Sequence, residues 1–166
     1  MGVVTTKATA ISNRDATPKI LSNANISKGT LMQLVGTIET TGTDSATSKY
    51  IMGSIPSNAR VSRVLLSCDG NNTSGAMDIG LYRTTLGGST VVDADLFASA
   101  QALGTALINS DVTHESAEFG IEDVEKPLWA ALGLSEDPKY HYDVVCTITT
   151  ADDSADTISL KVEYVI

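Results

Sequence analysis

From Leu31 onward, apolar and polar residues alternate along the chain with a period of two. In residues 31–39, Met32, Leu34 and Ile38 fall on one side of the chain, opposite a row of mainly polar residues. This period is typical of a β-strand with one buried face. The same pattern predicts strands at residues 49–56, 60–68, 77–82 and 90–92, separated by turns rich in Gly, Asn, Asp and Ser.

The C-terminal end carries the clearest alternation. Residues 140–150 and 157–166 each place apolar side chains on one side, and the acidic turn 151–156 separates them. We expect the two runs to pair as a hairpin with one buried face. The expected buried side chains are Val144, Cys146, Ile148, Leu160, Val162 and Tyr164. Seven or eight strands at this spacing predict an all-β fold, a jelly-roll-like antiparallel β-sandwich with short helical connections.

Two segments interrupt the strand pattern. Residues 93–103 place Leu96, Ala100 and Leu103 on one helical face behind Asp95, a plausible N-cap. A short helix and an irregular crossing are both compatible with this segment. Residues 123–132 favour one or two helical turns, with a break near Pro127. Both segments are expected to be connections between strands.

The first thirty residues show no sustained period and are rich in Thr, Ser, Asn and Ala, with Pro18 among them. They predict an extended N-terminal arm, residues 1–30, ahead of a β-sandwich domain, residues 31–166. A disordered tail and an arm that becomes ordered only against a partner both fit this composition.

Charge is distributed unevenly between these two parts. The whole chain carries 11 Lys and Arg against 20 Asp and Glu, a net charge of −9. The arm has a net charge of +3, so the remaining residues carry −12. Phosphate would repel so acidic a domain, which argues against direct binding of nucleic acid. The candidate contacts to an acidic partner surface are Lys7, Arg14, Lys19 and Lys28.

Other features of the chain exclude several classes of protein. No apolar run approaches the roughly 18 residues that a membrane-spanning helix needs, so no membrane partner is expected. Cys68 and Cys146 are too few for a disulfide framework or a structural zinc site, and both fall on apolar faces of strands. We interpret both as core residues.

The two histidines lack the neighbours that catalysis requires. His141 shares the polar face of its strand with Asp143, but no G-x-S-x-G nucleophile turn is present. His114 is followed by Glu115 in a polar stretch without an HEXXH motif. We interpret His114 as an exposed loop residue.

Two groups of acids are candidates for a site. Asp152, Asp153 and Asp156 suggest calcium, but the EF-hand pattern is not met, and solvated turn residues explain the group more simply. Asp93 and Asp95 could act as an acid and base pair in a glycosidase, yet capping or turn roles fit better in a chain with one Trp and two Phe. The sequence therefore predicts no catalytic, cofactor-binding or metal site, and a protein that is not an enzyme.

Three stretches resemble a known class of proteins. They are Ile55-Pro56-Ser57-Asn58-Ala59-Arg60-Val61, Met77-Asp78-Ile79-Gly80-Leu81-Tyr82 and Asp93-Ala94-Asp95-Leu96-Phe97-Ala98-Ser99-Ala100. Together with the β-rich C-terminus, they resemble the capsid cement or decoration proteins of tailed bacteriophages over about residues 50–166. The resemblance implies a jelly-roll virion protein that binds the outside of the major capsid protein shell as a homo-oligomer across joints between capsomers. It carries no active site over to this chain.

The expected function is thus that of a structural virion protein on the outer surface of a capsid, which stabilises the shell. The alternative is a carbohydrate-binding jelly-roll module of a phage head fibre or receptor-binding protein. Scarce Trp and Phe argue against this alternative, while five tyrosines keep it open.

Overall fold

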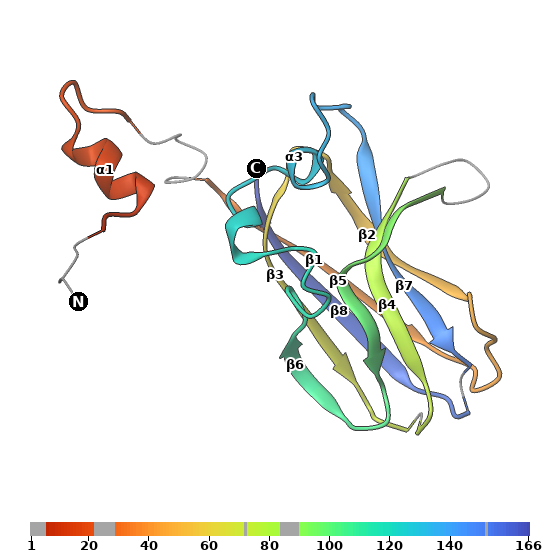
Figure 1. Ribbon diagram of the computed structural model, residues 1–166. Coiled ribbons are helices and arrows are strands. Elements are labelled where there is room, and N and C mark those ends of the chain that lie inside the picture. The colour runs from red at the N-terminus through yellow and green to blue at the C-terminus, as the bar shows by residue number, and fades with distance from the viewer. Residues whose placement is uncertain (1–5, 22–28, 72, 84–89, 152) are drawn as a thin grey trace. The chain divides into compact units, whose positions relative to one another are not determined.

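The computed structural model describes residues 6–21, 29–71, 73–83, 90–151 and 153–166 (Figure 1). The chain divides into two units, residues 1–30 and residues 31–166. In the first unit, helix α1 (Thr9–Asp15) has no buried residue. The predicted arm is therefore not extended throughout, because it contains this short helix. Residues 9–15 contain neither glycine nor proline, so local backbone hydrogen bonds such as that from Ser12 N–H to the Ala8 carbonyl can form a short helix.

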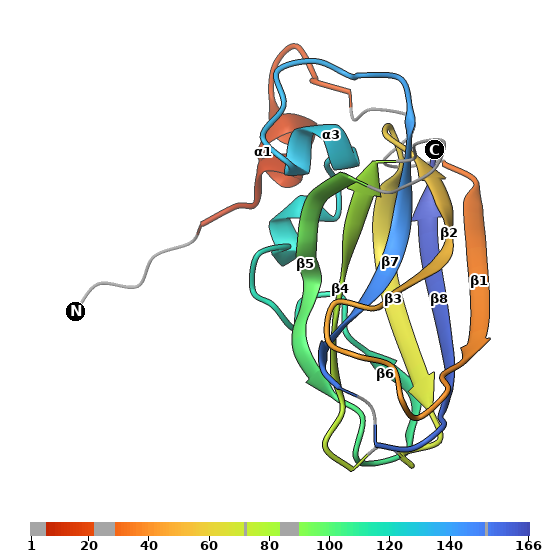
Figure 2. The same ribbon diagram turned by 90° about the vertical axis from the view of Figure 1, so that its right-hand side faces the viewer.

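The second unit is a β-sandwich. Its strands are β1 (Leu31–Glu39), β2 (Lys49–Pro56), β3 (Arg60–Cys68), β4 (Ala76–Arg83), β5 (Thr90–Ala102), β6 (Leu107–Asp111), β7 (His141–Thr150) and β8 (Thr157–Val165). They form two four-stranded antiparallel sheets with the orders β1-β8-β3-β6 and β2-β7-β4-β5. This strand order is that of an eight-stranded jelly roll, so the predicted fold is confirmed. The edge strands β1 and β2 lie next to each other (Figure 2).

The hydrophobic core lies between the two sheets. All six side chains expected to be buried at the C-terminal end are buried, as are Cys68 and the large side chains of Tyr82, Phe97 and Phe119. The predicted hairpin is nevertheless wrong. Strand β7 pairs with β2 and β4, whereas β8 pairs with β1 and β3 in the other sheet. Alternation reports which face of a strand is buried, and both strands bury a face against the same core.

Residues 93–103 form neither of the two connections considered for them, a short helix or an irregular crossing, because residues up to Ala102 belong to β5. The pairing of β5 with β4 shifts register three times, and extra residues are inserted between Asp93 and Ala98. Such bulges leave Leu96, Phe97 and Ala98 buried in succession, which hides the period of two. The short strand β6, which the sequence pattern did not reveal, pairs with β3.

Two short helical elements connect β6 to β7. They are the 3-10 helix η1 (Ile121–Asp123) and helix α3 (Leu128–Ala131), which begins directly after Pro127 as its position predicted. Leu128 is fully buried, and its N–H donates to the Ala59 carbonyl at 2.9 Å. These contacts fasten α3 over the turn between β2 and β3.

Among the described residues, no helix has both the length and the apolar character needed to cross a membrane.

Candidate functional site

The four basic residues proposed for partner contact lie in the arm. Lys7 and Arg14 each form an ion pair with Asp15, with N–O distances of 2.8 Å. Lys19 is exposed, and Lys28 lies outside the described residues. The Lys7 and Arg14 side chains are themselves more than half exposed, so these cations face solvent as well as Asp15.

The histidines and cysteines have local structural roles. The Nδ1 atom of His114 lies 2.6 Å from the Phe119 carbonyl oxygen, and its ring stacks on that of Phe119. His114 is exposed, as expected, and closes the loop 114–119. Cys68 and Cys146 are free and buried, and burial raises the pKa of both thiols. Their predicted place in the core is confirmed.

Of the acids in the turn before β8, Asp153 is exposed as expected, whereas Asp156 is not. Asp156 is fully buried, and its carboxylate accepts a hydrogen bond of 2.8 Å from the Asp69 N–H. Asp153 accepts hydrogen bonds from the Thr73 N–H, the Thr73 hydroxyl and the Ser74 hydroxyl. Asp152 lies outside the described residues. Asp153 and Asp156 therefore tie the turn between β7 and β8 to the turn between β3 and β4.

A different acidic group forms where β5 bulges away from β4. A Cβ atom on Gly80 of β4 would lie only 2.2 Å from the Asp93 carbonyl oxygen, so the bulge passes over a position that only glycine can occupy. The bulge places the Asp93 and Asp95 carboxylates close together. Asp95 also accepts a hydrogen bond of 3.1 Å from the Ser99 hydroxyl.

Glu118 reaches the same place from the loop that follows β6. This loop is attached to β5 by the Ser116 hydroxyl, which donates to the Leu96 carbonyl, and by Glu115, which accepts from the Ser99 N–H. As a result, Asp93, Asp95 and Glu118 each bring a carboxylate oxygen within 4.8 Å of the others. We call these three residues the acidic triad.

The triad concentrates negative charge. Burial is the main cause that raises the pKa of Asp93, and the nearby Asp95 carboxylate raises it further. The Asp93 and Asp95 carboxylates in turn raise the pKa of Glu118. No ion pair joins a member of the triad to a Lys, Arg or His within the described ranges. The Asp93 and Glu118 side chains share a hydrogen bond, and a cation in this position would further relieve the repulsion among the three carboxylates.

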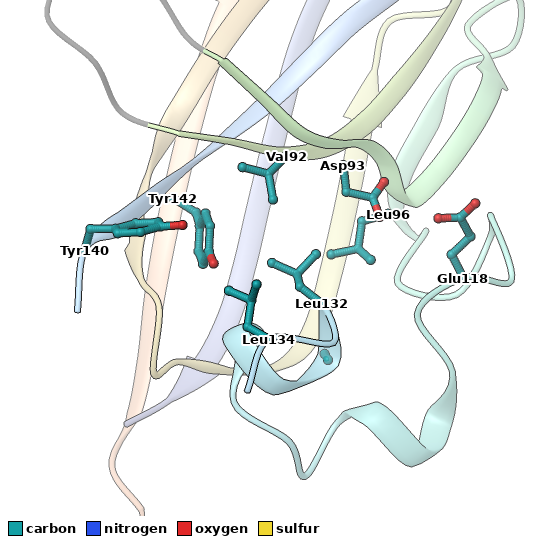
Figure 3. A pocket seen from close by; sticks show the side chains of 9 residues that line it. Val92, Asp93, Leu96, Glu118, Leu132, Leu134, Tyr140 and Tyr142 are labelled. Atoms are coloured by element: carbon teal, nitrogen blue, oxygen red, sulfur yellow. The ribbon is translucent and has the colours of Figure 1, made fainter. Parts of the chain in front are cut away.

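Asp93 and Glu118 of the triad lie at one end of a pocket of about 400 Å³ (Figure 3). Leu132 and Leu134, which follow α3, form one apolar wall, and Val92 and Leu96 of β5 contribute the other. Tyr140 and Tyr142 line the end away from the triad. We call this cavity the β5–α3 pocket.

The two tyrosines pack edge to face, with ring centroids 5.1 Å apart. The Tyr142 hydroxyl is buried and makes no hydrogen bond of good geometry within the described part of the chain. Figure 3 shows it on the side of the ring that faces Leu134. Burial is the main cause that raises the pKa of Tyr142, and the adjacent Tyr140 phenol adds to this effect. The guanidinium of Arg83 covers the Tyr140 ring at 4.9 Å from its centroid.

Part of this site is visible in the sequence. The two-residue spacing of Asp93 and Asp95 marks them as neighbours. Glu118, Tyr142 and the apolar walls leave no such signal, because they come from segments that only the fold brings together. Asp143, expected on the polar face with His141, is buried within β7, whereas His141 is exposed.

Comparisons with known proteins connect the fold to phage capsids. No family model and no curated protein matches this chain significantly. Among solved structures, a chain of the capsid of Ralstonia phage GP4 matches with a TM-score of 0.58 and 17% identity, covering 82% of this chain and 84% of that one. A chain of the cyanophage Pam1 capsid asymmetric unit matches with a TM-score of 0.50 and 14% identity, covering 83% and 86%. At such low identity, the matches show a shared fold.

Proposed function

We propose that this chain is a non-enzymatic structural component of a phage virion, a cement or decoration protein that binds the outer surface of the capsid shell. The observation that carries the proposal is the shared fold. The similarity to chains of two phage capsids extends over more than four fifths of this chain and of each of theirs. A jelly roll alone occurs in many classes of protein, but these two structures are both capsids.

The charge of the sandwich supports an exterior position. Residues 31–166 carry a net charge of −12, and the interior of a filled head is lined by nucleic acid phosphate. An acidic domain of this size is repelled by that surface and remains soluble on the outer one.

Two features supply surfaces for attachment to the major capsid protein and to further copies of this chain. The first is the open edge formed by β1 and β2, where the exposed side chains of Leu31, Val35 and Ile51 lie on edge strands. Edge strands with exposed apolar side chains are favourable positions for pairing with another chain. The second is the basic arm, whose Lys7, Arg14, Lys19 and Lys28 can meet an acidic surface.

The tyrosines disfavour the carbohydrate-binding alternative. All five lie within the described residues; Tyr82, Tyr142 and Tyr164 are buried, and Tyr50 and Tyr140 are half-buried. A sugar-binding platform requires the face of an aromatic ring to be open to solvent. None of these side chains is exposed enough to offer one.

Imaging of virions tests the proposal. Electron cryomicroscopy of heads from the phage that encodes this chain should show its jelly roll outside the shell, and mass spectrometry should detect the chain in the same particles. Val35→Lys at the open edge should reduce binding of the purified protein to heads that lack it. Ile108→Lys is the control, because Ile108 is also exposed but lies on the opposite edge strand, β6. A chain absent from heads, or located inside the shell, contradicts the proposal.

A further inference from the structure

The β5–α3 pocket combines three kinds of surface. Its acidic end holds Asp93 and Glu118, its middle is walled by leucine and valine, and its far end holds the buried Tyr142 hydroxyl. A volume of about 400 Å³ is at the small end of the range of ligand pockets. It has room for one small organic group.

Each surface restricts the chemistry of that group. Carboxylates that form no ion pair within the described residues favour a cation, which is held best when its N–H groups donate directly to the oxygens. The apolar walls favour a hydrocarbon stem of several carbons. A buried phenol without a good hydrogen bond is costly, so a polar group that reaches Tyr142 would be stabilised by it.

We propose that the β5–α3 pocket binds a lysine or arginine side chain that a partner protein presents. The aliphatic stem packs between Leu132, Leu134 and Val92, and the charged head lies against Asp93 and Glu118. This inference rests on the proposed function in one respect: the capsid protein of the shell is taken as the partner that presents the side chain.

A divalent metal ion explains less of the pocket. Calcium prefers six to eight oxygen ligands, and the triad supplies three carboxylates. A bare ion also makes no use of the leucine walls. The apolar surface therefore favours an organic cation over a metal.

Titration of the isolated full-length chain tests the site without any capsid. The probe is butylguanidinium, which carries the head and most of the stem of arginine, and the readout is the backbone amide NMR spectrum. We expect saturable shifts confined to residues around Asp93, Glu118 and Leu132. Guanidinium without the butyl group should bind about tenfold more weakly, because it lacks the stem that the apolar walls contact.

Paired variants assign the binding to the carboxylates. Asp93→Asn combined with Glu118→Gln should weaken butylguanidinium binding by at least about tenfold. The matched control is Glu122→Gln combined with Glu125→Gln, which removes the same charge from exposed residues outside the pocket lining and should leave binding unchanged.

Two results overturn the inference. One is an absence of saturable shifts at the pocket. The other is that calcium or guanidinium shifts the same amide signals at concentrations as low as butylguanidinium does. That result would show an ion site that does not use the apolar walls. If the titration fails while the chain is still found on the outside of heads, the pocket proposal falls and the proposed function stands.

Discussion

Asp156 shows how one carboxylate holds two turns of the sandwich in place. The residue is fully buried, its Oδ1 atom accepts from the Asp69 N–H, and its own N–H donates to the Thr40 hydroxyl at 3.0 Å. The Thr40 N–H donates in return to the Asp156 carbonyl at 2.9 Å. Asp156 therefore links the ends of β1, β3 and β8 at one end of the sandwich.

Removing this carboxylate should destabilise the fold. Asp156→Ala leaves the Asp69 N–H without its acceptor, and an unsatisfied buried group costs about 1–3 kcal/mol. We expect a loss of that size in the free energy of unfolding, measured by urea denaturation. Asp156→Asn, which keeps an oxygen at Oδ1, should lose less. Equal losses in both variants would show that the charge of Asp156, rather than the hydrogen bond to Asp69, stabilises the turns.

Asp93 should make the stability of the domain depend on pH. Burial raises the pKa of Asp93 above that of the unfolded chain, so the folded state binds this proton more tightly. The contribution of Asp93 to stability is therefore lost as the pH rises from about 4 through its raised pKa. Asp93→Asn should raise the melting temperature at pH 7 and have little effect near pH 3.

Asp137 is the matched control for this pH dependence, because its pKa is shifted the other way. Hydrogen bonds from the Ser57 hydroxyl and the Lys139 N–H lower the pKa of Asp137. Asp137→Asn should lower the melting temperature at pH 7, and this difference should shrink in acid. Thermal melts from pH 3 to 7 compare the two variants directly. If the effect of Asp93→Asn on the melting temperature does not depend on pH, Asp93 is not the cause of the predicted change of stability with pH.

At the scale of elements, the bulge of β5 depends on one glycine. Gly80 lies under the bulge, where a Cβ atom would meet the backbone of Asp93 and Ala94 at 2.2–2.4 Å. Backbone atoms cannot rotate away as a side chain can, so any larger residue must push β5 off β4. The position of Asp93, and with it the acidic triad, thus depends on Gly80.

Gly80→Ala should therefore cost stability and disturb the pocket together. Overpacking of this kind costs about 1–3 kcal/mol, measurable by urea denaturation, and the amide signals around Asp93 should move. Gly133→Ala is the control, because its added methyl group has nothing within 4 Å and only the positive φ of 74° opposes it. Gly80→Ala with a cost no larger than that of Gly133→Ala would show that β5 is not held tightly over β4.

The same elements show what a sequence pattern can and cannot predict. Alternation located strands β1, β2, β3, β4, β7 and β8 with bounds close to those observed, because each buries one face in the same core. It predicted the wrong partner for β8. Alternation shows which face of a single strand is buried, whereas the hydrogen-bonded partner depends on a second strand. It missed the course of β5, since inserted residues shift the period.

The candidate site was less predictable than the fold for a related reason. The two-residue spacing of Asp93 and Asp95 is visible in the sequence, but Glu118, Leu134 and Tyr142 lie 23 or more residues further along the chain. They line the same pocket as Asp93 because the loop after β6 is bonded to β5, α3 is anchored over the turn before β3, and β7 pairs with β4. Such tertiary contacts leave no local pattern in the amino-acid sequence.

At the scale of the whole molecule, opposite charges are separated along the chain. The first thirty residues carry +3 and the sandwich carries −12, and the two form separate units. Exposed ion pairs contribute roughly 0.2–1 kcal/mol each, so four cations acting together can hold a partner surface although each is weak alone. Ordering the arm also costs about 1–2 kcal/mol per residue fixed, which requires further contacts, such as those of the exposed Ile20 and Leu21.

Deletion of residues 1–28 should separate folding from attachment. The described part of α1 buries nothing, so the sandwich should keep its melting temperature while binding to heads, or assembly into oligomers, weakens on the order of tenfold. Replacing Lys7, Arg14, Lys19 and Lys28 by Gln keeps the length of the arm and isolates its charge. Attachment of the unaltered chain should then weaken between 0.1 and 1 M salt, where the screening length falls from about 10 to 3 Å, whereas attachment of the Gln variant should change little. Undiminished binding by both variants would remove the arm from the interface and leave the open edge formed by β1 and β2 as the surface that contacts the shell.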